Sequence, residues 1–129
     1  MRYLGIDYGS KKIGLAVSDE SGRVAFPLQV IPNTKKLLAE VVAICRQENI
    51  AKIICGLSLD FSGQDNPIAK EAKDFCNQLI SEINLPLEFE NEFLTSVFAG
   101  QISPQNKEID ARAAALILQR FLDRTKNNS

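Results

Sequence analysis

Through its first 19 residues the chain alternates bulky apolar side chains with small or polar ones. Over Tyr3–Tyr8 and again over Ile13–Ser18, this period of two predicts a pair of β-strands joined by a glycine turn. The hairpin would have one bulky apolar face and one face of small residues. Asp7 falls on the small-residue face, where a carboxylate needs water, a cation or a hydrogen-bond donor as its partner. The small residues of that face are Gly5, Gly14, Ala16 and Ser18.

The rest of the hydrophobic pattern predicts three further strands and three helices. We expect strands at 23–31, 51–57 and 85–90, and helices at 34–49, 67–83 and 104–124. Pro27 favours an edge position or a bulge for the third strand. The order β-β-β-α-β-α-β-α predicts an α/β fold in which a mixed five-stranded sheet carries helices on both faces. We expect residues 1–129 to form a single domain.

Charge and hydropathy limit the partners and the compartment. The 15 basic and 16 acidic residues give a net charge of -1, so any polyanion must be held by a local patch or through a metal. The chain enters a strand at once and has no apolar run near the ~18 residues of a membrane span, which predicts a cytoplasmic protein. Nothing in the sequence distinguishes RNA from DNA, and no aromatic platform for single-stranded bases is apparent.

The absence of histidine restricts the chemistry further. It excludes Ser-His-Asp triads, Cys-His pairs and imidazole zinc sites. Cys45, Cys55 and Cys76 are odd in number, widely spaced and set in apolar patterns, which predicts buried reduced thiols. If the protein catalyses hydrolysis, carboxylates and a hard cation are therefore the expected tools.

Several acidic residues fall where an open α/β sheet binds its ligands, at the carboxyl ends of the strands. Asp7 ends the first strand, Glu90 and Glu92 lie at the end of the last strand, and Asp110 precedes an apolar stripe on the final helix. Alanines 113–115 would let this helix pack closely on the small-residue face and bring Asp110 toward Asp7. Such acids would repel one another unless a divalent cation such as Mg²⁺ or Mn²⁺ neutralised them.

Each of these residues also has a simpler interpretation. Asp7 could accept hydrogen bonds from the backbone of the adjacent glycine turn. Glu92 could be a solvated loop acid, and Asp110 could complement a helix dipole. Lys11 and Lys12 in the turn could be solvated rather than bound to nucleic acid. The convergence of three acids, rather than any one of them, indicates a metal site.

Five segments, taken in order, resemble the YqgF/RuvX family of small proteins with a ribonuclease H-like fold. They are LGIDYGSKKIGLAVSD at 4–19, AFPL at 25–28, GLSLDFSG at 56–63, ENEFLTSVFA at 90–99 and IDARAAALILQRFL at 109–122. The family is related to the RuvC Holliday-junction resolvases and includes proteins named as pre-16S rRNA nucleases. The resemblance implies a nuclease dependent on Mg²⁺ or Mn²⁺, with Asp7, Glu92 and Asp110 as catalytic and metal-binding acids. It implies pre-rRNA or branched DNA as partner and an association with the ribosome, and we expect Lys11 and Lys12 to contact the nucleic acid.

The chain departs from the family pattern around these acids. Asn91, Glu92 and Phe93 stand where the family usually has Asp-Glu-Arg, so an arginine suited to clamping phosphate is replaced. Ser58 replaces the usual proline, and the connection 96–109 is short with one basic residue, Lys107. The three acids remain, but the positive charge for substrate binding is reduced. A divergent, non-catalytic RNA- or ribosome-associated binding protein of the same fold is therefore the alternative.

A third interpretation comes from the first turn. GIDYGS at 5–10 also resembles the phosphate-binding element of actin-like ATPases and sugar kinases. Those enzymes hold nucleotide between two lobes, whereas this chain is expected to form one. A nucleotide-dependent kinase is therefore the least favoured alternative.

Overall fold

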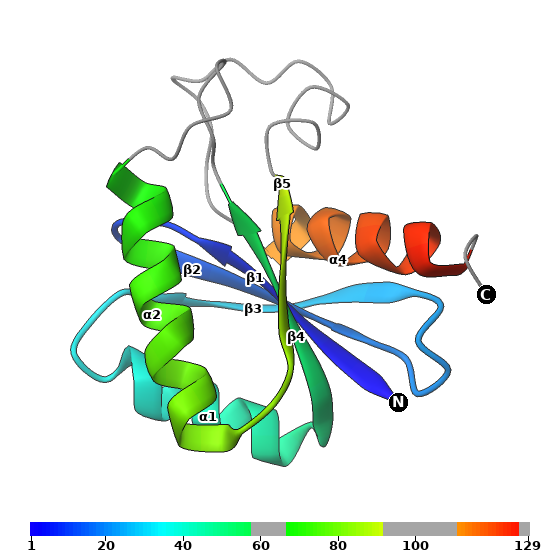
Figure 1. The fold of residues 1–129 in the computed structure, drawn as a ribbon, viewed down its shortest axis with the longest axis horizontal. Helices are drawn as coiled ribbons and strands as arrows, with labels where there is room; N and C mark the ends of the chain where they lie inside the picture. Colours follow the sequence, from blue (N-terminus) through cyan, green and yellow to red (C-terminus); the bar gives the residue numbers. More distant parts are fainter. Residues whose placement is uncertain (58–66, 92–110, 127–129) are drawn as a thin grey trace.

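The computed structural model describes residues 1–57, 67–91 and 111–126, which form one five-stranded sheet flanked by helices (Figure 1). The strands are β1 (Arg2–Tyr8), β2 (Lys12–Ser18), β3 (Ala25–Pro32), β4 (Ile50–Leu57) and β5 (Leu87–Asn91). The helices are α1 (Leu37–Gln47), α2 (Pro67–Ile83) and α4 (Ala111–Lys126). The strand order is β3-β2-β1-β4-β5. The mixed sheet predicted from the sequence is confirmed.

The antiparallel and parallel halves of the sheet meet at β1. This strand pairs antiparallel with β2 and parallel with β4, while β3 and β5 extend the two halves in the same senses. The short turns between the first three strands allow only antiparallel pairing, and the helical crossovers through α1 and α2 return the chain for parallel pairing. The carboxyl ends of β1, β4 and β5 therefore lie at one edge of the sheet.

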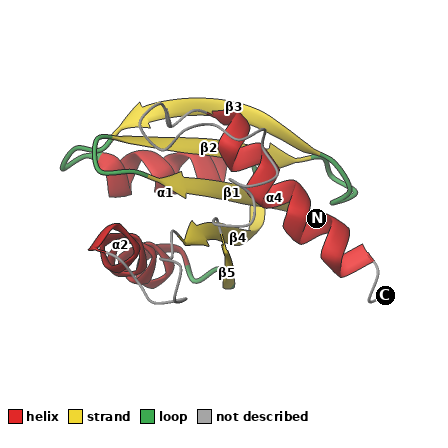
Figure 2. Cartoon of the chain, turned by 90° about the horizontal axis from the view of Figure 1, so that it is seen from above, coloured by secondary structure: helices red, strands yellow, loops and turns green. Residues whose placement is uncertain are grey.

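The helices divide between the two faces of the sheet, as Figures 1 and 2 show. Helices α1 and α2 cover one face, where large aliphatic side chains of β1, β2 and β4 form the main core. Among the described residues, helix α4 is the element that covers the other face, and its packed residues form a second, smaller cluster. The members of that cluster are Ala16, Ile54, Ala114, Ile117, Leu118, Phe121 and Leu122.

Helix α4 lies very close to the sheet because glycines line its path. A Cβ atom on Gly5 would lie 2.8 Å from Cβ of Leu118 and 2.9 Å from the carbonyl oxygen of Ala114. A Cβ atom on Gly56 would lie 2.6 Å from Cδ1 of Ile117. The predicted docking of the last helix on the small-residue face is confirmed.

A glutamine side chain fixes α4 along the sheet. Gln119 Oε1 accepts a hydrogen bond of 2.9 Å from the backbone N–H of Ala25, and its Nε2 donates to the carbonyl of Arg23 at 2.9 Å. Nε2 also donates to Oδ1 of Asp123 at 3.0 Å. One amide thus joins the helix to the start of the edge strand β3.

Local details confirm one prediction and correct another. Pro27 lies in an edge strand, and the β2–β3 register shifts beside it between Leu15 and Ala16. The first helix was predicted to begin at residue 34, which is wrong because α1 begins at Leu37. Thr34 instead forms a turn, in which its hydroxyl accepts a hydrogen bond of 3.2 Å from the N–H of Lys36.

The cysteines are buried, as predicted. Cys45, Cys55 and Cys76 have exposed fractions of 3%, 0% and 0%. Burial raises the pKa of the Cys45 thiol to about 11, because the thiolate would lose its hydration. Cys45 is therefore an inert core residue at neutral pH.

Candidate functional site

Asp7 is a buried carboxylate at the carboxyl end of β1. It is 0% exposed and lies opposite Gly14 of β2 and Gly56 of β4. Because Gly5 on the same face contacts α4, Asp7 also lies on the face that α4 covers. The position predicted for this residue, on the small-residue face at the carboxyl end of the first strand, is where the structure places it.

Asp7 shares a row across the sheet with a second buried acid. Asp7 is in register with Gly56, and Gly56 is in register with Glu90 of β5. The two acids are separated by two strand spacings, about 9–10 Å at the backbone. Because Gly56 has no side chain, β4 places nothing between them on this face.

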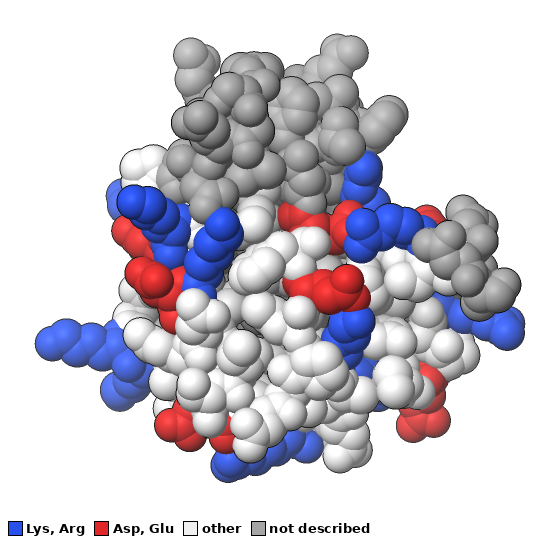
Figure 3. Space-filling view, viewed as in Figure 1, with Lys and Arg blue, Asp and Glu red and all other residues white. Residues whose placement is uncertain are grey.

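Glu90 is neutralised by two arginines of α4. The residue is 4% exposed, Arg120 Nε lies 3.2 Å from its Oε2, and Arg124 pairs with its Oε1. Figure 3 shows acidic and basic atoms side by side where β5 meets α4. Glu90 therefore joins β5 to α4 instead of adding a negative charge to the site.

Sequence reasoning placed Glu90 at the strand end but missed its partners. The available signal was the spacing of Arg120 and Arg124, which are four residues apart and so lie on one side of the helix. Phe121 lies between them in sequence, with Arg124 5.6 Å and Lys52 5.1 Å from the centre of its ring. Lys52 also pairs with Glu88 of β5. Both glutamates of β5, Glu88 and Glu90, are thus paired with basic side chains.

The other two predicted acids lie outside the described residues. Glu92 follows Asn91, the last residue of β5, and Asp110 precedes Ala111, the first residue of α4. Within residues 1–57, 67–91 and 111–126 no three acidic or cysteine side chains form a metal-binding group. The shared site of Asp7, Glu92 and Asp110 therefore stays a prediction. Phe93, Ser58 and Lys107 also lie outside these ranges.

Lys11 and Lys12 are exposed at the β1–β2 turn, next to the end that carries Asp7. Asn33 braces this turn, because its backbone N–H donates to the carbonyl of Lys11 and its Nδ2 to the carbonyl of Gly9, both at 2.9 Å. The turn is therefore fixed against the segment that leads into α1. That segment carries two more exposed lysines, Lys35 and Lys36.

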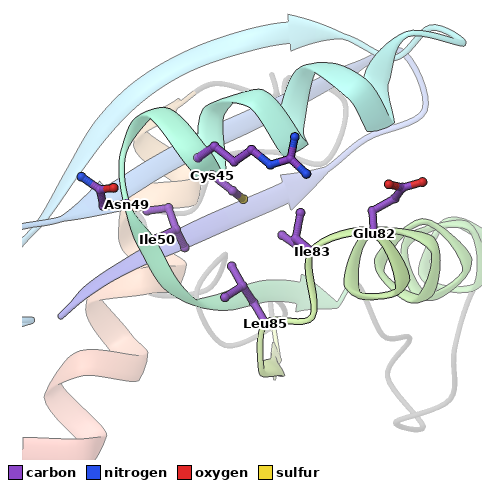
Figure 4. A pocket seen from close by; sticks show the side chains of 7 residues that line it. Cys45, Asn49, Ile50, Glu82, Ile83 and Leu85 are labelled. Carbon is purple, nitrogen blue, oxygen red and sulfur yellow. The ribbon is translucent and has the colours of Figure 1, made fainter.

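The pockets that the described residues line include two on the side of the sheet that α1 and α2 cover. One, of about 330 Å³, is at the carboxyl end of β1 and is lined by residues from β1, α1, α2 and the segment before α1. The lining residues are Tyr8, Asn33, Thr34, Lys35, Leu37, Leu38, Glu71, Asp74, Phe75 and Gln78. The other, of about 390 Å³, is at the opposite edge, where α1 ends and β4 begins (Figure 4). Its lining residues are Cys45, Arg46, Asn49, Ile50, Glu82, Ile83 and Leu85.

Across the described ranges, no helix is both long enough and apolar enough to span a membrane.

Comparisons with known proteins agree on one family. A family model described as "RuvX: Holliday junction resolvase" matches residues 1–124. A protein of Chloroflexus aggregans described as "Putative pre-16S rRNA nuclease" is 34% identical over 134 residues, which cover 96% of this chain and 94% of that protein. One of Sulfurihydrogenibium sp. with the same description is 37% identical over 131 residues, covering 95% and 90%.

Solved structures show the same fold at low sequence identity. Thermus thermophilus RuvC in complex with a Holliday junction substrate matches with a TM-score of 0.68 at 14% identity, covering 100% of this chain and 98% of that one. The fowlpox virus Holliday junction resolvase matches with a TM-score of 0.57 at 13% identity, covering 96% and 99%. The likeness confirms the ribonuclease H-like fold of the RuvC resolvases. With the family match over residues 1–124, the chain belongs to the RuvX family.

Proposed function

We propose that the protein is a divalent-metal-dependent nuclease that hydrolyses phosphodiester bonds in pre-rRNA or branched DNA. The observation that carries the proposal is Asp7, a fully buried carboxylate at the ligand-binding edge of the sheet. Membership of a family described as Holliday junction resolvases, and relatives described as pre-16S rRNA nucleases, support it. The exposed Lys11 and Lys12 at the same edge provide positive charge for the phosphate backbone.

The residues present fit a hard cation. Carboxylate oxygens are the ligands that Mg²⁺ and Mn²⁺ prefer, and Asp7 is held by strand pairing on both sides of β1. Asp7, Glu92 and Asp110 would hold the ion, the latter two because they adjoin β5 and α4 in the chain. When bound, the ion would supply an activated water and charge stabilisation at the phosphate. Glu90 would act only by positioning, since its charge is balanced by Arg120 and Arg124.

The packing of α4 contributes to the site by excluding water from the row that contains Asp7. Gly5 and Gly56 let the helix approach the sheet, and Ile117 and Leu118 fill the space above them. A carboxylate in such surroundings is held in one position and feels nearby charges strongly. The helix thus shapes one wall of the site.

Cleavage assays with an Asp7→Asn variant test the proposal. A labelled single-stranded RNA with a pre-16S 5′ leader and a four-way DNA junction would be incubated in parallel with Mg²⁺, Mn²⁺ or EDTA. We expect metal-dependent cutting by the native protein and a loss of about 100-fold or more in Asp7→Asn, since even residues that only support metal ligands cost about 10–100-fold. Glu82→Gln, at the opposite edge of the sheet, is the matched control and should cut normally. Absence of cutting by folded native protein on both substrates would contradict the proposal.

Metal binding can be measured without turnover. A ligand at about 100 times its Kd stabilises a folded protein by about 2.7 kcal/mol, so Mn²⁺ should raise the Tm of the native protein. The rise should be absent in Asp7→Asn and intact in Glu82→Gln. An equal rise in all three proteins would show that Asp7 does not bind the ion.

A non-catalytic binding protein remains the second candidate, and Glu90 favours it. The acid in register with Asp7 is neutralised by arginines, and the family's usual arginine is Phe93 here. This candidate predicts that RNA or ribosome binding is indifferent to EDTA and to Asp7→Asn. Gel-shift titrations of native and variant protein with and without Mg²⁺ would distinguish the two candidates.

A further inference from the structure

The pocket at the carboxyl end of β1 lies across the sheet from Asp7. Asp7 and Tyr8 are consecutive strand residues, so their side chains point to opposite faces, and Tyr8 lines the pocket of about 330 Å³. Pockets of this size are in the range that holds small molecules. The pocket and Asp7 therefore share one edge of the sheet, with the Gly9–Lys12 turn beside both.

An aromatic pair lines one part of the pocket. The rings of Tyr8 and Phe75 lie 5.7 Å apart between centroids and are tilted by 38°. Phe75 is 7% exposed, while Tyr8 is only partly buried, so Tyr8 is the ring that a ligand can contact. A partly exposed tyrosine supported by a buried ring is a stacking surface for a flat ligand.

The polar groups of the pocket suit a base better than a phosphate. Glu71, Asp74 and Gln78 lie on successive turns of α2, so two carboxylates and an amide line the pocket from this helix. Asn33 and Lys35 line the pocket from the segment before α1. Two carboxylates against one lysine disfavour a bound phosphate, but carboxylates accept hydrogen bonds from the amino and ring N–H groups of bases.

Positive charge for a phosphate backbone lies at the rim of this pocket. Lys11 and Lys12 are exposed in the β1–β2 turn, and Lys35 and Lys36 are exposed before α1. The hydrogen bonds of Asn33 to Gly9 and Lys11 hold the two lysine pairs together. A nucleic-acid strand with one base in the pocket would thus have lysine side chains near its phosphates on both sides of that base.

We propose that this pocket receives one unstacked base of a single-stranded nucleic acid and prefers guanine. Guanine offers N–H donors on its ring and amino group to Glu71 and Asp74, whereas uracil offers one ring donor between two carbonyls. The base stacks on Tyr8, and the backbone passes over the lysine turn toward Asp7. This inference rests on the proposed nuclease function, because it assigns to the pocket the selection of the nucleic-acid strand that reaches Asp7.

Binding without cleavage tests the base preference. The full-length protein in EDTA would be titrated, by fluorescence anisotropy, into a labelled eight-nucleotide uridine strand and the same strand with one central guanine. We expect about tenfold tighter binding of the guanine strand, since one well-paired base edge is worth about 1–3 kcal/mol. The double variant Glu71→Gln/Asp74→Asn should bring the ratio of the two affinities close to one. The ratio is the relevant measure, because removing two negative charges strengthens binding of every strand.

Stacking is tested separately through Tyr8. Tyr8→Leu should lower the affinity for both RNA strands about tenfold. Tyr8→Phe keeps the aromatic ring and should bind both strands like the native protein. Glu82→Gln and Arg46→Gln, in the pocket of Figure 4 at the opposite edge, are the matched controls. Each should leave the ratio of the two affinities unchanged and should alter the affinities themselves far less than Tyr8→Leu does. Far-ultraviolet circular dichroism and Tm would exclude unfolding of Tyr8→Leu.

The tyrosine count provides a direct optical readout. The chain has no tryptophan and two tyrosines, and Tyr3 lies on the other face, in edge-to-face contact with Phe121. In Tyr3→Phe the emission comes from Tyr8 alone and should be quenched by the guanine strand. In Tyr8→Phe, where only Tyr3 emits, no quenching is expected.

The outcomes separate this inference from the proposed function. Equal affinity for both strands, with no effect of Tyr8→Leu, would overturn the base pocket and leave the Asp7 cleavage test untouched. Competition by guanosine monophosphate is a second check. If it displaces the RNA strand at a concentration equal to the strand's own Kd, the pocket is a site for a free nucleotide, and the inference is overturned. A guanine preference lost with Glu71 and Asp74 would support it even if Asp7→Asn proved to have no effect on cleavage.

Discussion

The two faces of the sheet are built by opposite rules. On the face that α1 and α2 cover, large side chains such as Leu4, Ile6 and Leu15 fill the space between sheet and helices. On the face that α4 covers, Gly5 and Gly56 have no side chains, and the helix therefore packs almost directly on the backbone of the sheet. The first face stabilises the protein by apolar volume, and the second leaves buried positions for the carboxylates of Asp7 and Glu90.

The difference teaches where a charged site can be placed in a small protein. A carboxylate on a face filled with large apolar side chains would be buried without polar partners, which is energetically costly. A face of small residues covered by a closely packed helix excludes water while leaving room for polar groups at its edge. Enlargement should therefore harm the α4 face and truncation the α1/α2 face.

Truncation on the filled face gives the largest expected loss of stability. Leu4 is 0% exposed and belongs to the main core, so Leu4→Ala should lower the free energy of unfolding by about 2–5 kcal/mol. Urea denaturation measures it, and Ala39, an exposed residue of α1, is a control position where Ala39→Ser should have little effect. A loss under about 1 kcal/mol, below the usual cost of such truncations, would break the contrast between the faces.

Enlargement on the α4 face is the complementary change. Gly5→Ala should cost about 1–3 kcal/mol, because its Cβ would meet the backbone oxygen of Ala114. Gly56→Ala should cost less, because its Cβ would meet the flexible end of Ile117. Adding Ile117→Val, which removes Cδ1, should recover part of the Gly56→Ala loss but none of the Gly5→Ala loss. A double-mutant cycle in urea would measure this coupling, and equal recovery in both would contradict it.

The buried acid of β5 gives a smaller effect. Glu90→Gln should lower the free energy of unfolding by about 1–3 kcal/mol, since it weakens charge-assisted contacts to Arg120 and Arg124. The arginines are 35% and 54% exposed and can be hydrated, which limits the loss. Glu88→Gln, on the same strand but half exposed beside Lys52, is the matched control and should cost about 0.2–1 kcal/mol. Equal losses would show that burial does not distinguish the two pairs.

The smallest expected effect lies outside both faces, in the turn before β3. Hydrogen bonds from Ser21 and from the backbone N–H groups of Arg23 and Val24 lower the pKa of Asp19 to about 2 from 3.8. A lowered folded-state pKa stabilises the protein above the unfolded value and loses that contribution as the pH falls through about 2. Asp19→Asn should therefore flatten the decline of Tm between about pH 4 and pH 2. An unchanged acid profile would show that these hydrogen bonds do not matter for folding.

The sequence predicted what depends on local alternation and missed what depends on distant pairing. The place of Asp7 followed from the strand period of its own segment, and the small residues around it predicted which helix would cover it. The pairing of Glu90 with Arg120 and Arg124 joins residues about 30 positions apart, and no spacing rule connects a strand to a later helix. The helix start at Leu37 was missed because Thr34 closes a turn of its own.

The base pocket shows the same limit more clearly. Tyr8 and Phe75 are isolated aromatic residues in the sequence, and each fits an ordinary strand or helix pattern. Only the crossover connections bring their rings within 5.7 Å beside Glu71 and Asp74. Chemistry assembled from segments far apart in the chain is visible only in the fold.

The close contact of Gly5 with Leu118 also sets an order of assembly during synthesis. β1 (Arg2–Tyr8) leaves the ribosome well before α4 (Ala111–Lys126). The strands and the two helices of the filled face all precede α4 in the chain, so they can begin to pair and pack while α4 is still inside the ribosome. We expect the face that holds Asp7 to stay open to solvent until α4 is released. A chain whose α4 is still inside the ribosome would then carry Asp7 on an open face, so that the proposed nuclease site is completed only after α4 has emerged.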